Sequence, residues 1–268
     1  MDAITAPTNS QAEIVPRAPS GLMLLAEGRF VLERAAFRSA RRRLAALPRG
    51  DGHAVLVLPG FLASDRSTAA LRAVLGDLGY QAHGWGFGRN TRVDLRRVKQ
   101  MEQLVKELRH RTGRKVSLIG WSLGGIFARE LAKLDPGSVR QVITLGSPIR
   151  DDRRHTNASG LFELVNGKEP ELLRQGRFAG LHRAPPVPTT TILSRGDGIV
   201  HWTGSVQQTG CGHEHTENIV VRGSHLGLVH NPAATLVIAD RLRQAENQWQ
   251  PFVPPAAHRW MFPLQELP

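Results

Sequence analysis

The sequence has a single cysteine, Cys211, among its 268 residues. An intrachain disulfide is therefore excluded, and the lone thiol is typical of a reducing compartment such as the cytoplasm. No stretch approaches the roughly 20 apolar residues that a membrane-spanning helix needs. Residues 1–20 have neither the basic start nor the apolar centre of a secretory signal. We therefore expect a cytoplasmic protein whose residues 1–20 form a mobile arm.

Acidic residues are also scarce: the sequence has 23 Asp and Glu but 35 Lys and Arg, which gives a net charge of +12. Such a charge can favour nucleic acid or an anionic membrane surface. Arginine is scattered, however, with Arg41–Arg43 as the tight run, and the sequence has no aromatic-and-basic nucleic-acid module. We expect an ordinary basic surface and no nucleic-acid partner, with peripheral contact to an anionic membrane as an alternative.

The apolar residues that are present form short runs that alternate with helical patterns. Apolar residues make up 41% of the chain, enough for a core in one large domain. Strands are predicted at 54–58, 80–85, 115–119, 139–145, 189–193 and 218–221, and helices at 67–78, 95–111, 123–134 and 232–244. This alternation predicts an α/β fold with a mostly parallel central sheet covered by helices. We find no internal repeat.

Four segments complete the predicted organisation. Residues 21–50 suit a helix, either packed against the main domain or lying on lipid, and we favour packing. Residues 51–248 form the α/β domain. Within it, residues 149–188 connect two strands, and this segment has too many residues for a plain loop, which predicts a lid or cap. The Pro-rich and aromatic tail, 249–268, is expected to be extended or mobile.

A Gly-x-Ser-x-Gly motif, Gly120-Trp121-Ser122-Leu123-Gly124, lies between a predicted strand and a predicted helix. This context is what a nucleophile elbow requires, because the serine must take a strained conformation that lifts its hydroxyl above the sheet. A serine hydroxyl becomes a strong nucleophile only when a base takes its proton. The motif therefore predicts Ser122 as a nucleophile.

The base and acid are expected in the chain order Ser, acid, His. His225 follows the last predicted strand and is favoured over His230 at the head of the next helix. Asp197 follows the strand at 189–193 and is favoured over Asp151 and Asp152, which resemble a surface cluster with the neighbouring arginines. We therefore predict a Ser122, His225 and Asp197 triad.

The oxyanion hole should use the backbone N–H of Leu123 and a second N–H from the loop after the first strand, where Phe61 is the best candidate. Apolar side chains near these loops predict an apolar acyl or alcohol group in the substrate: Leu62, Trp121, Trp202 and Phe162. The Cys211-Gly212-His213-Glu214-His215 segment crowds metal-ligand types into one loop without a partner cluster, so we expect no metal and no other cofactor.

Over residues 54–240 the chain resembles a bacterial esterase or lipase of the α/β-hydrolase superfamily. The motifs that carry this resemblance are Leu58-Pro59-Gly60-Phe61, Gly120-Trp121-Ser122-Leu123-Gly124-Gly125, Leu145-Gly146-Ser147-Pro148, Asp197-Gly198-Ile199-Val200 and Gly223-Ser224-His225-Leu226-Gly227. Lipase relatives usually have His-Gly where this chain has Pro59-Gly60, which changes the hydrogen bonds around the oxyanion loop but keeps its N–H groups. The resemblance implies an α/β-hydrolase fold and hydrolysis of small-molecule or lipid-like esters. Acyl transfer, thioester or lactone cleavage, and a non-catalytic binding role are the alternatives, and no feature indicates an oligomeric state.

Overall fold

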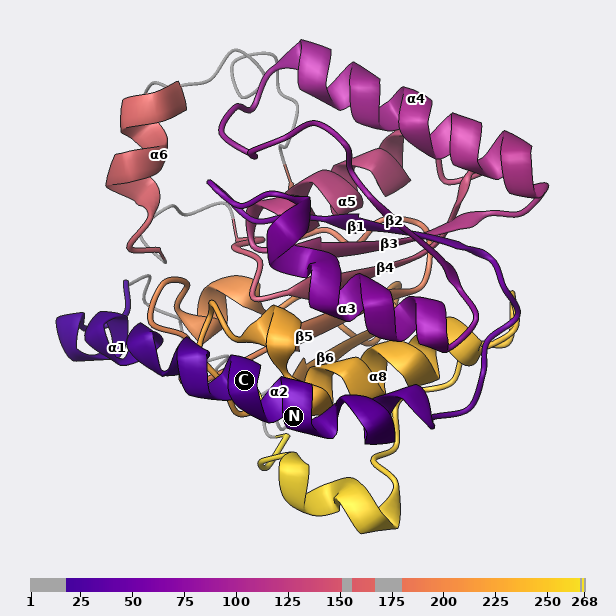
Figure 1. Cartoon of the computed structure of the whole chain (residues 1–268). Helices are drawn as coiled ribbons and strands as arrows, with labels where there is room; N and C mark the ends of the chain where they lie inside the picture. The colour runs from indigo at the N-terminus through magenta and orange to yellow at the C-terminus, as the bar shows by residue number, and fades with distance from the viewer. Residues whose placement is uncertain (1–17, 151–155, 167–179, 266, 268) are drawn as a thin grey trace, which may run out of the picture.

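The computed structural model describes residues 18–150, 156–166, 180–265 and 267. Within these ranges six strands form one sheet in the order β2-β1-β3-β4-β5-β6, and every neighbouring pair is parallel (Figure 1). The strands are β1 (Ala54–Leu58), β2 (Gln81–Gly84), β3 (Val116–Trp121), β4 (Val139–Leu145), β5 (Thr189–Leu193) and β6 (Thr216–Val220). The predicted parallel, helix-covered sheet is confirmed, although β3 runs two residues beyond its expected end.

Helices cover both faces of this sheet. The first face carries α4 (Leu95–Thr112) and α5 (Leu123–Leu134), and the second carries α3 (Asp65–Asp77) and α8 (Pro232–Arg243). Helix α4 begins at the cap Asp94, which accepts a hydrogen bond from the Arg97 N–H, and ends at Gly113 with φ 66°. Both caps satisfy backbone groups that a helix end leaves unpaired.

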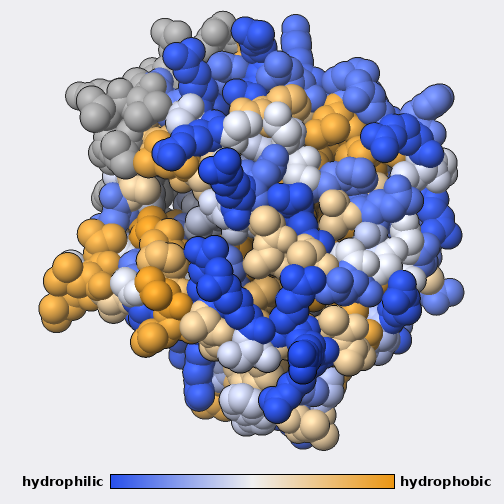
Figure 2. Space-filling model, viewed as in Figure 1, coloured by the Kyte–Doolittle hydropathy of each residue, from blue (hydrophilic) through white to orange (hydrophobic). Residues whose placement is uncertain are grey.

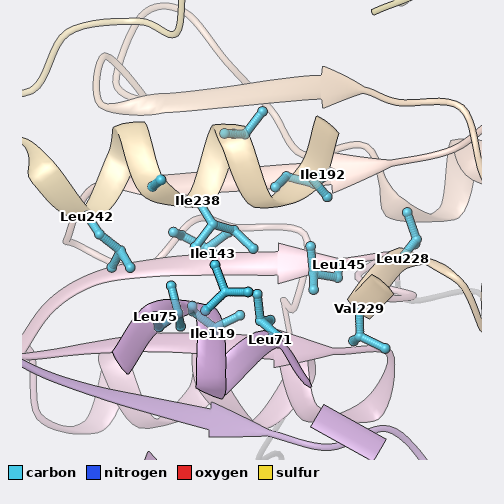
Figure 3. Close-up of a cluster of buried hydrophobic side chains, with 14 of the residues drawn as sticks. Leu71, Leu75, Ile119, Ile143, Leu145, Ile192, Leu228, Val229, Ile238 and Leu242 are labelled. Carbon is cyan, nitrogen blue, oxygen red and sulfur yellow. The ribbon is translucent and has the colours of Figure 1, made fainter. Parts of the chain in front are cut away.

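The side chains of the strands alternate between two cores. Val55 and Val57 of β1 point to the α3 and α8 side, whereas Ala54, Leu56 and Leu58 point to the α4 and α5 side. This alternation follows from the two-residue period of a strand, and it explains why β1 is apolar at every position. Figure 3 shows the first core, where side chains of α3 and α8 meet those of β3, β4 and β5.

The N-terminal segment is helical but interrupted. It consists of α1 (Gly21–Leu25), the 3₁₀ helix η1 (Ala26–Arg29) and α2 (Phe30–Ala45), where the sequence predicted one helix. Helix α2 packs against α3 and α8 through the buried Phe37 and Leu44. In the described part of the chain, no helix has both the length and the apolar character needed to cross a bilayer.

Among the described residues, four shorter elements lie in the loops after the strands and in the C-terminal tail. They are α6 (Ser159–Asn166) and the 3₁₀ helices η3 (Trp202–Ser205), η4 (Leu228–His230) and η5 (Ala256–Met261). In the tail, the rings of Phe252 and Phe262 lie 5.2 Å apart and pack against the main core. Residues 1–17 of the predicted arm (1–20), the acid candidates Asp151 and Asp152, and part of the predicted lid lie outside the described residues.

Candidate active site

Ser122 forms the turn between β3 and α5 and has an unusual backbone conformation. Its φ is 53° and its ψ is −122°, in a region that costs a non-glycine residue about 1–3 kcal/mol. The flanking glycines permit this turn. A Cβ on Gly120 would lie 2.3 Å from the Gly124 carbonyl oxygen, and one on Gly124 would lie 2.2 Å from the Leu58 carbonyl oxygen. The serine itself is half-buried.

His225 and Asp197 form a buried hydrogen-bonded pair. Nδ1 of His225 lies 2.6 Å from Oδ2 of Asp197, and each residue is 2% exposed. The other carboxylate oxygen, Oδ1, accepts hydrogen bonds from the N–H groups of Ile199 at 2.9 Å and Val200 at 2.7 Å. These bonds fix the carboxylate so that Nδ1 donates to it, which makes Nε2 the nitrogen that can take a proton.

The serine turn and the acid–base pair meet at the carboxyl ends of β3 and β4. The Ser122 N–H donates to the Leu145 carbonyl oxygen at 2.9 Å. The next residue, Gly146, lies against the pair, since a Cβ there would be 2.9 Å from Oδ2 of Asp197 and 3.2 Å from Nδ1 of His225. From the other side, the Trp121 indole donates to the His225 carbonyl oxygen at 3.0 Å.

No described residue hydrogen-bonds to the Ser122 hydroxyl, so its hydrogen bond with the His225 ring is not formed in this structure. Such contacts often tighten only when substrate binds. The Ser122 turn and the His225–Asp197 pair therefore lie at the same edge of the sheet without a hydrogen bond between the serine hydroxyl and the ring.

The pKa of His225 is held above its ordinary value of 6.5. Burial pulls the pKa down, because it disfavours the charged ring, but the charge and hydrogen bond of Asp197 and the charge of Glu27 outweigh that effect. The pair therefore favours an imidazolium, the form that a general base reaches after it has taken a proton.

The loop after β1 passes directly beside the serine. A Cβ on Gly60 would lie 3.2 Å from the Ser122 Cβ, and Phe61 follows it. At the other side of this turn, the N–H of Leu123 lies in the first turn of α5, where backbone N–H groups have no partner within the helix. Of the two amides predicted for an oxyanion hole, that of Leu123 thus lies in the first turn of α5 and that of Phe61 in the loop beside Ser122.

Asn90, which sequence reasoning missed, supports that loop. It is fully buried, its side-chain amide donates to the Pro59 carbonyl oxygen at 2.7 Å, and its backbone pairs with Leu62 at 2.7 Å and Ala63 at 2.8 Å. Leu62 takes a φ of 61° within this turn. Asn90 therefore supplies hydrogen bonds to a loop that lacks the histidine usual in lipases.

The residues predicted to bind substrate lie in different places. Phe61 and Phe162 are in edge-to-face contact with ring centroids 5.5 Å apart, next to the exposed Leu62. Trp121 is 6% exposed, and its indole donates to the backbone of His225. Trp202 belongs to a separate cluster with Leu193, Val206 and Val220, under the Arg195 guanidinium.

Asp197 pairs with His225 and not with the competing histidine, His230, whose ring packs edge-on against Phe37 with ring centroids 5.9 Å apart. The Cys211–His215 loop is largely exposed. Among the described residues, no group of three or more His, Cys, Asp or Glu side chains could hold a metal ion.

A second Asp-His-Ser arrangement lies near the opposite end of the sheet. Nδ1 of His53 is 2.5 Å from Oδ1 of Asp51, and Nε2 is 2.7 Å from the Ser117 hydroxyl. Both His53 and Ser117 are fully buried, and Ser117 lies inside β3 rather than in a strained turn. Substrate cannot reach this serine, so we assign these contacts to satisfying polar groups in the core.

The solved structures most like this chain include enzymes that act on esters and thioesters. Lipase B of Aspergillus fumigatus matches with a TM-score of 0.57 and 18% identity, over 74% of this chain and 54% of the fungal enzyme. The mature lipase BlEst2 of Bacillus licheniformis matches with a TM-score of 0.53 and 16% identity, over 74% of this chain and 95% of that one. A thioesterase domain from the curacin biosynthetic pathway matches with a TM-score of 0.51 and 16% identity, over 73% of this chain and 93% of the domain.

The chain therefore has the α/β-hydrolase fold. The family described as the PGAP1-like alpha/beta domain matches residues 90–200, which include β3, the Ser122 turn and Asp197. No curated protein matches the sequence. The match to the fungal lipase spans about half the length of that enzyme.

Proposed function

We propose that this protein hydrolyses carboxylic esters with Ser122 as the nucleophile, His225 as the general base and Asp197 as the carboxylate that orients the base. The observation that carries the proposal is the strained backbone of Ser122, with φ 53°, at a strand-to-helix turn beside a buried His–Asp pair. Strain of this kind is retained where surrounding structure enforces it, and it is concentrated at functional sites.

The proposed reaction has two steps. Nε2 of His225 takes the proton of Ser122 as the hydroxyl oxygen attacks the ester carbonyl, and the resulting oxyanion is held by the N–H groups of Leu123 and Phe61. His225 then gives its proton to the leaving alcohol, and an acyl-enzyme remains on Ser122. Water, activated by the same ring, hydrolyses that acyl-enzyme and restores the serine.

The substrate is proposed to carry an apolar acyl or alcohol group. The side chains that support this are the Phe61–Phe162 pair and the exposed Leu62, which lie on and beside the oxyanion loop. The contacts of Trp121 and Trp202 with substrate remain predictions. The described neighbour of Trp121 is His225, and Trp202 packs in the cluster beside β5 and β6.

A thioester is the second candidate substrate, favoured by the similarity in fold to a thioesterase domain. The same serine, base and oxyanion donors serve both reactions, since both pass through an acyl-enzyme. Comparing kcat/KM for matched acyl esters and acyl thioesters separates the two.

Hydrolysis of p-nitrophenyl esters of increasing chain length tests the proposal. We expect measurable turnover that rises with an apolar acyl group. The Ser122→Ala variant should stay folded and lose activity by a factor on the order of 10⁴ or more. An unchanged rate in Ser122→Ala would overturn the assignment of the nucleophile.

We also propose that the outer face of α1 and α2 contacts an anionic lipid surface. Leu22 and Leu25 are each 80% exposed and Leu32 is 72% exposed, and Figure 2 shows a projecting apolar group at the position of α1. The same segment carries exposed arginines at 34, 38, 42 and 43, whereas Arg41 is ion-paired with Asp77. Apolar side chains beside a basic stretch suit the interface of an anionic bilayer.

Co-sedimentation with phosphatidylcholine vesicles, with and without phosphatidylserine, tests this contact. We expect binding that requires phosphatidylserine and weakens in Leu22→Ser and Leu25→Ser, but not in Leu264→Ser, an exposed tail residue. Equal binding by all three variants, or self-association of the protein in place of binding, would contradict it. The cytoplasmic location expected from the single cysteine stays a prediction.

A further inference from the structure

A carboxylate from the N-terminal segment reaches the two loops that carry Asp197 and His225. Glu27 lies in η1, outside the sheet and its covering helices, yet it is only 4% exposed. Its Oε1 accepts hydrogen bonds from the N–H groups of Gly198 and His225, each at 2.8 Å, and its Oε2 accepts one from Leu226 at 2.9 Å.

Three backbone donors are an unusual concentration for one side chain. Burying a carboxylate is costly unless hydrogen bonds replace those made by water, and the three N–H groups provide that replacement. Gly198 follows Asp197 directly, and His225 is itself the base. Because a single oxygen of Glu27 binds both amides, it fixes the distance between the acid loop and the base loop.

Two further charged side chains of the same segment contact these loops, Arg29 both of them and Glu33 the loop of His225. The Arg29 guanidinium donates to the Gly196 carbonyl oxygen at 2.5 Å and to the Gly223 carbonyl oxygen at 3.0 Å. Glu33 accepts from the N–H of Ser224 at 2.9 Å and from its hydroxyl at 2.5 Å. The N-terminal segment therefore contacts both loops at several points through polar groups.

We propose that Glu27 is a positioning residue for the reaction. By binding the backbone of both loops, it keeps the His225 ring aligned with Asp197. This inference rests on the proposed function, in which His225 is the base. The competing interpretation is that Glu27 only anchors the N-terminal helices to the domain.

The charge of Glu27 gives the proposal a measurable signature. The charged groups that act on the His225 ring are Asp197 and Glu27, and both raise its pKa against the opposing effect of burial. The ring must be neutral to take the proton of Ser122, so activity rises as the pH passes upward through this pKa. Removing the charge of Glu27 lowers the pKa and moves the acidic limb of the pH–rate profile to lower pH.

The test compares Glu27→Gln with a control on the same segment. Gln keeps the shape of the side chain, but its NH₂ group faces the N–H of Leu226 and cannot accept from it. The control is Arg41→Gln, which breaks the 2.7 Å ion pair from α2 to Asp77 of α3 without touching either triad loop. Both variants weaken an anchor of the N-terminal helices, whereas only the first contacts the acid and base loops.

We expect Glu27→Gln to lower kcat about 10- to 100-fold with little change in KM, and to shift the acidic limb downward. Arg41→Gln should match the wild type in kcat and in pH profile. If Glu27→Gln shows the wild-type kcat and an unmoved acidic limb, Glu27 is an anchor alone. Glu27→Asp, which keeps the charge on a shorter side chain, should keep the pH profile while losing part of kcat.

An NMR titration of the His225 ring separates this inference from the proposed function, because it needs no turnover. A pKa that is lower in Glu27→Gln than in the wild type supports the positioning role even if no ester is hydrolysed. Equal pKa values in the two proteins would overturn it. A wild type that cleaves no ester and binds no serine-directed probe would instead overturn the proposed function.

Discussion

Substitution of Gly146 tests whether the acid–base pair depends on the close packing beneath it. Gly146 has φ 55°, and an alanine Cβ would lie 2.7 Å from the Leu228 side chain, 2.9 Å from Oδ2 of Asp197 and 3.2 Å from Nδ1 of His225. A left-handed backbone costs an alanine about 1–2 kcal/mol, and overpacking a close contact costs about 1–3 kcal/mol more. We therefore expect Gly146→Ala to lower the free energy of unfolding by about 2–5 kcal/mol.

Gly113→Ala is the matched control, because Gly113 has a similar φ of 66° but nothing within 4 Å of its Cβ position. It should lose only the backbone part, about 1–2 kcal/mol. Urea unfolding measures both variants, and the difference between them reports the contacts of Gly146.

Activity gives the second measurement for the same pair of variants. Since the new methyl group must push Asp197 or His225 away, kcat should fall on the order of 100-fold in Gly146→Ala, as expected for a misplacement of about 1 Å. Gly113→Ala should keep the wild-type kcat. If both variants unfold alike and both keep full activity, the pair does not rest on Gly146 and the reasoning about this site is wrong.

Three further predictions follow from the site and its surroundings. Asn90→Ala should lower kcat about 10-fold and stability by about 1–3 kcal/mol, because the oxyanion loop loses a buried donor; kinetics and urea unfolding check both effects. Because the pKa of His225 is raised in the folded protein, its contribution to the free energy of unfolding is fully present below pH 6.5 and is lost as the pH rises through the folded-state pKa. Unfolding measured against pH should show this loss in the wild type and not in His225→Gln. Ser117→Ala should leave kcat unchanged while costing about 1–3 kcal/mol, because His53 loses a buried partner, whereas Ser122→Ala should do the opposite.

The sheet was predictable because each of its strands has a recognisable pattern in its own local sequence. The runs at 54–58, 139–145 and 189–193 have the predicted bounds, since each is a short, largely apolar or β-branched segment limited by Pro, Gly or polar residues. The interruption at η1 carried no such signal. Gly28 is a weak helix former, but a single glycine does not distinguish a 3₁₀ turn from a continuous helix.

The candidate site was predictable to the extent that it follows the strands. Ser122 directly follows β3, and Asp197 and His225 lie in the loops after β5 and β6; parallel strands place such positions at one edge of the sheet. Glu27 was not predictable, because its partners at 198, 225 and 226 are about 170 to 200 residues away in the chain. Single polar contacts at that distance leave no periodic pattern.

The same limit applies to the supporting and the misleading residues. Asn90 gives no sign in the sequence that its side chain will hold the loop at Pro59. The contacts of Asp51, His53 and Ser117 have the residue types of a catalytic triad, and they differ from the site at Ser122 because Ser117 is fully buried inside a strand and not in a strained turn.

The central claim is that Ser122 is an activated nucleophile, and covalent labelling with a fluorophosphonate followed by peptide mass spectrometry tests it most directly. We predict one probe per chain on the peptide that contains Ser122, slower labelling in His225→Ala, and no labelling in Ser122→Ala. A folded wild type that takes up no probe, or a Ser122→Ala variant that is labelled as fast as the wild type, would contradict the claim.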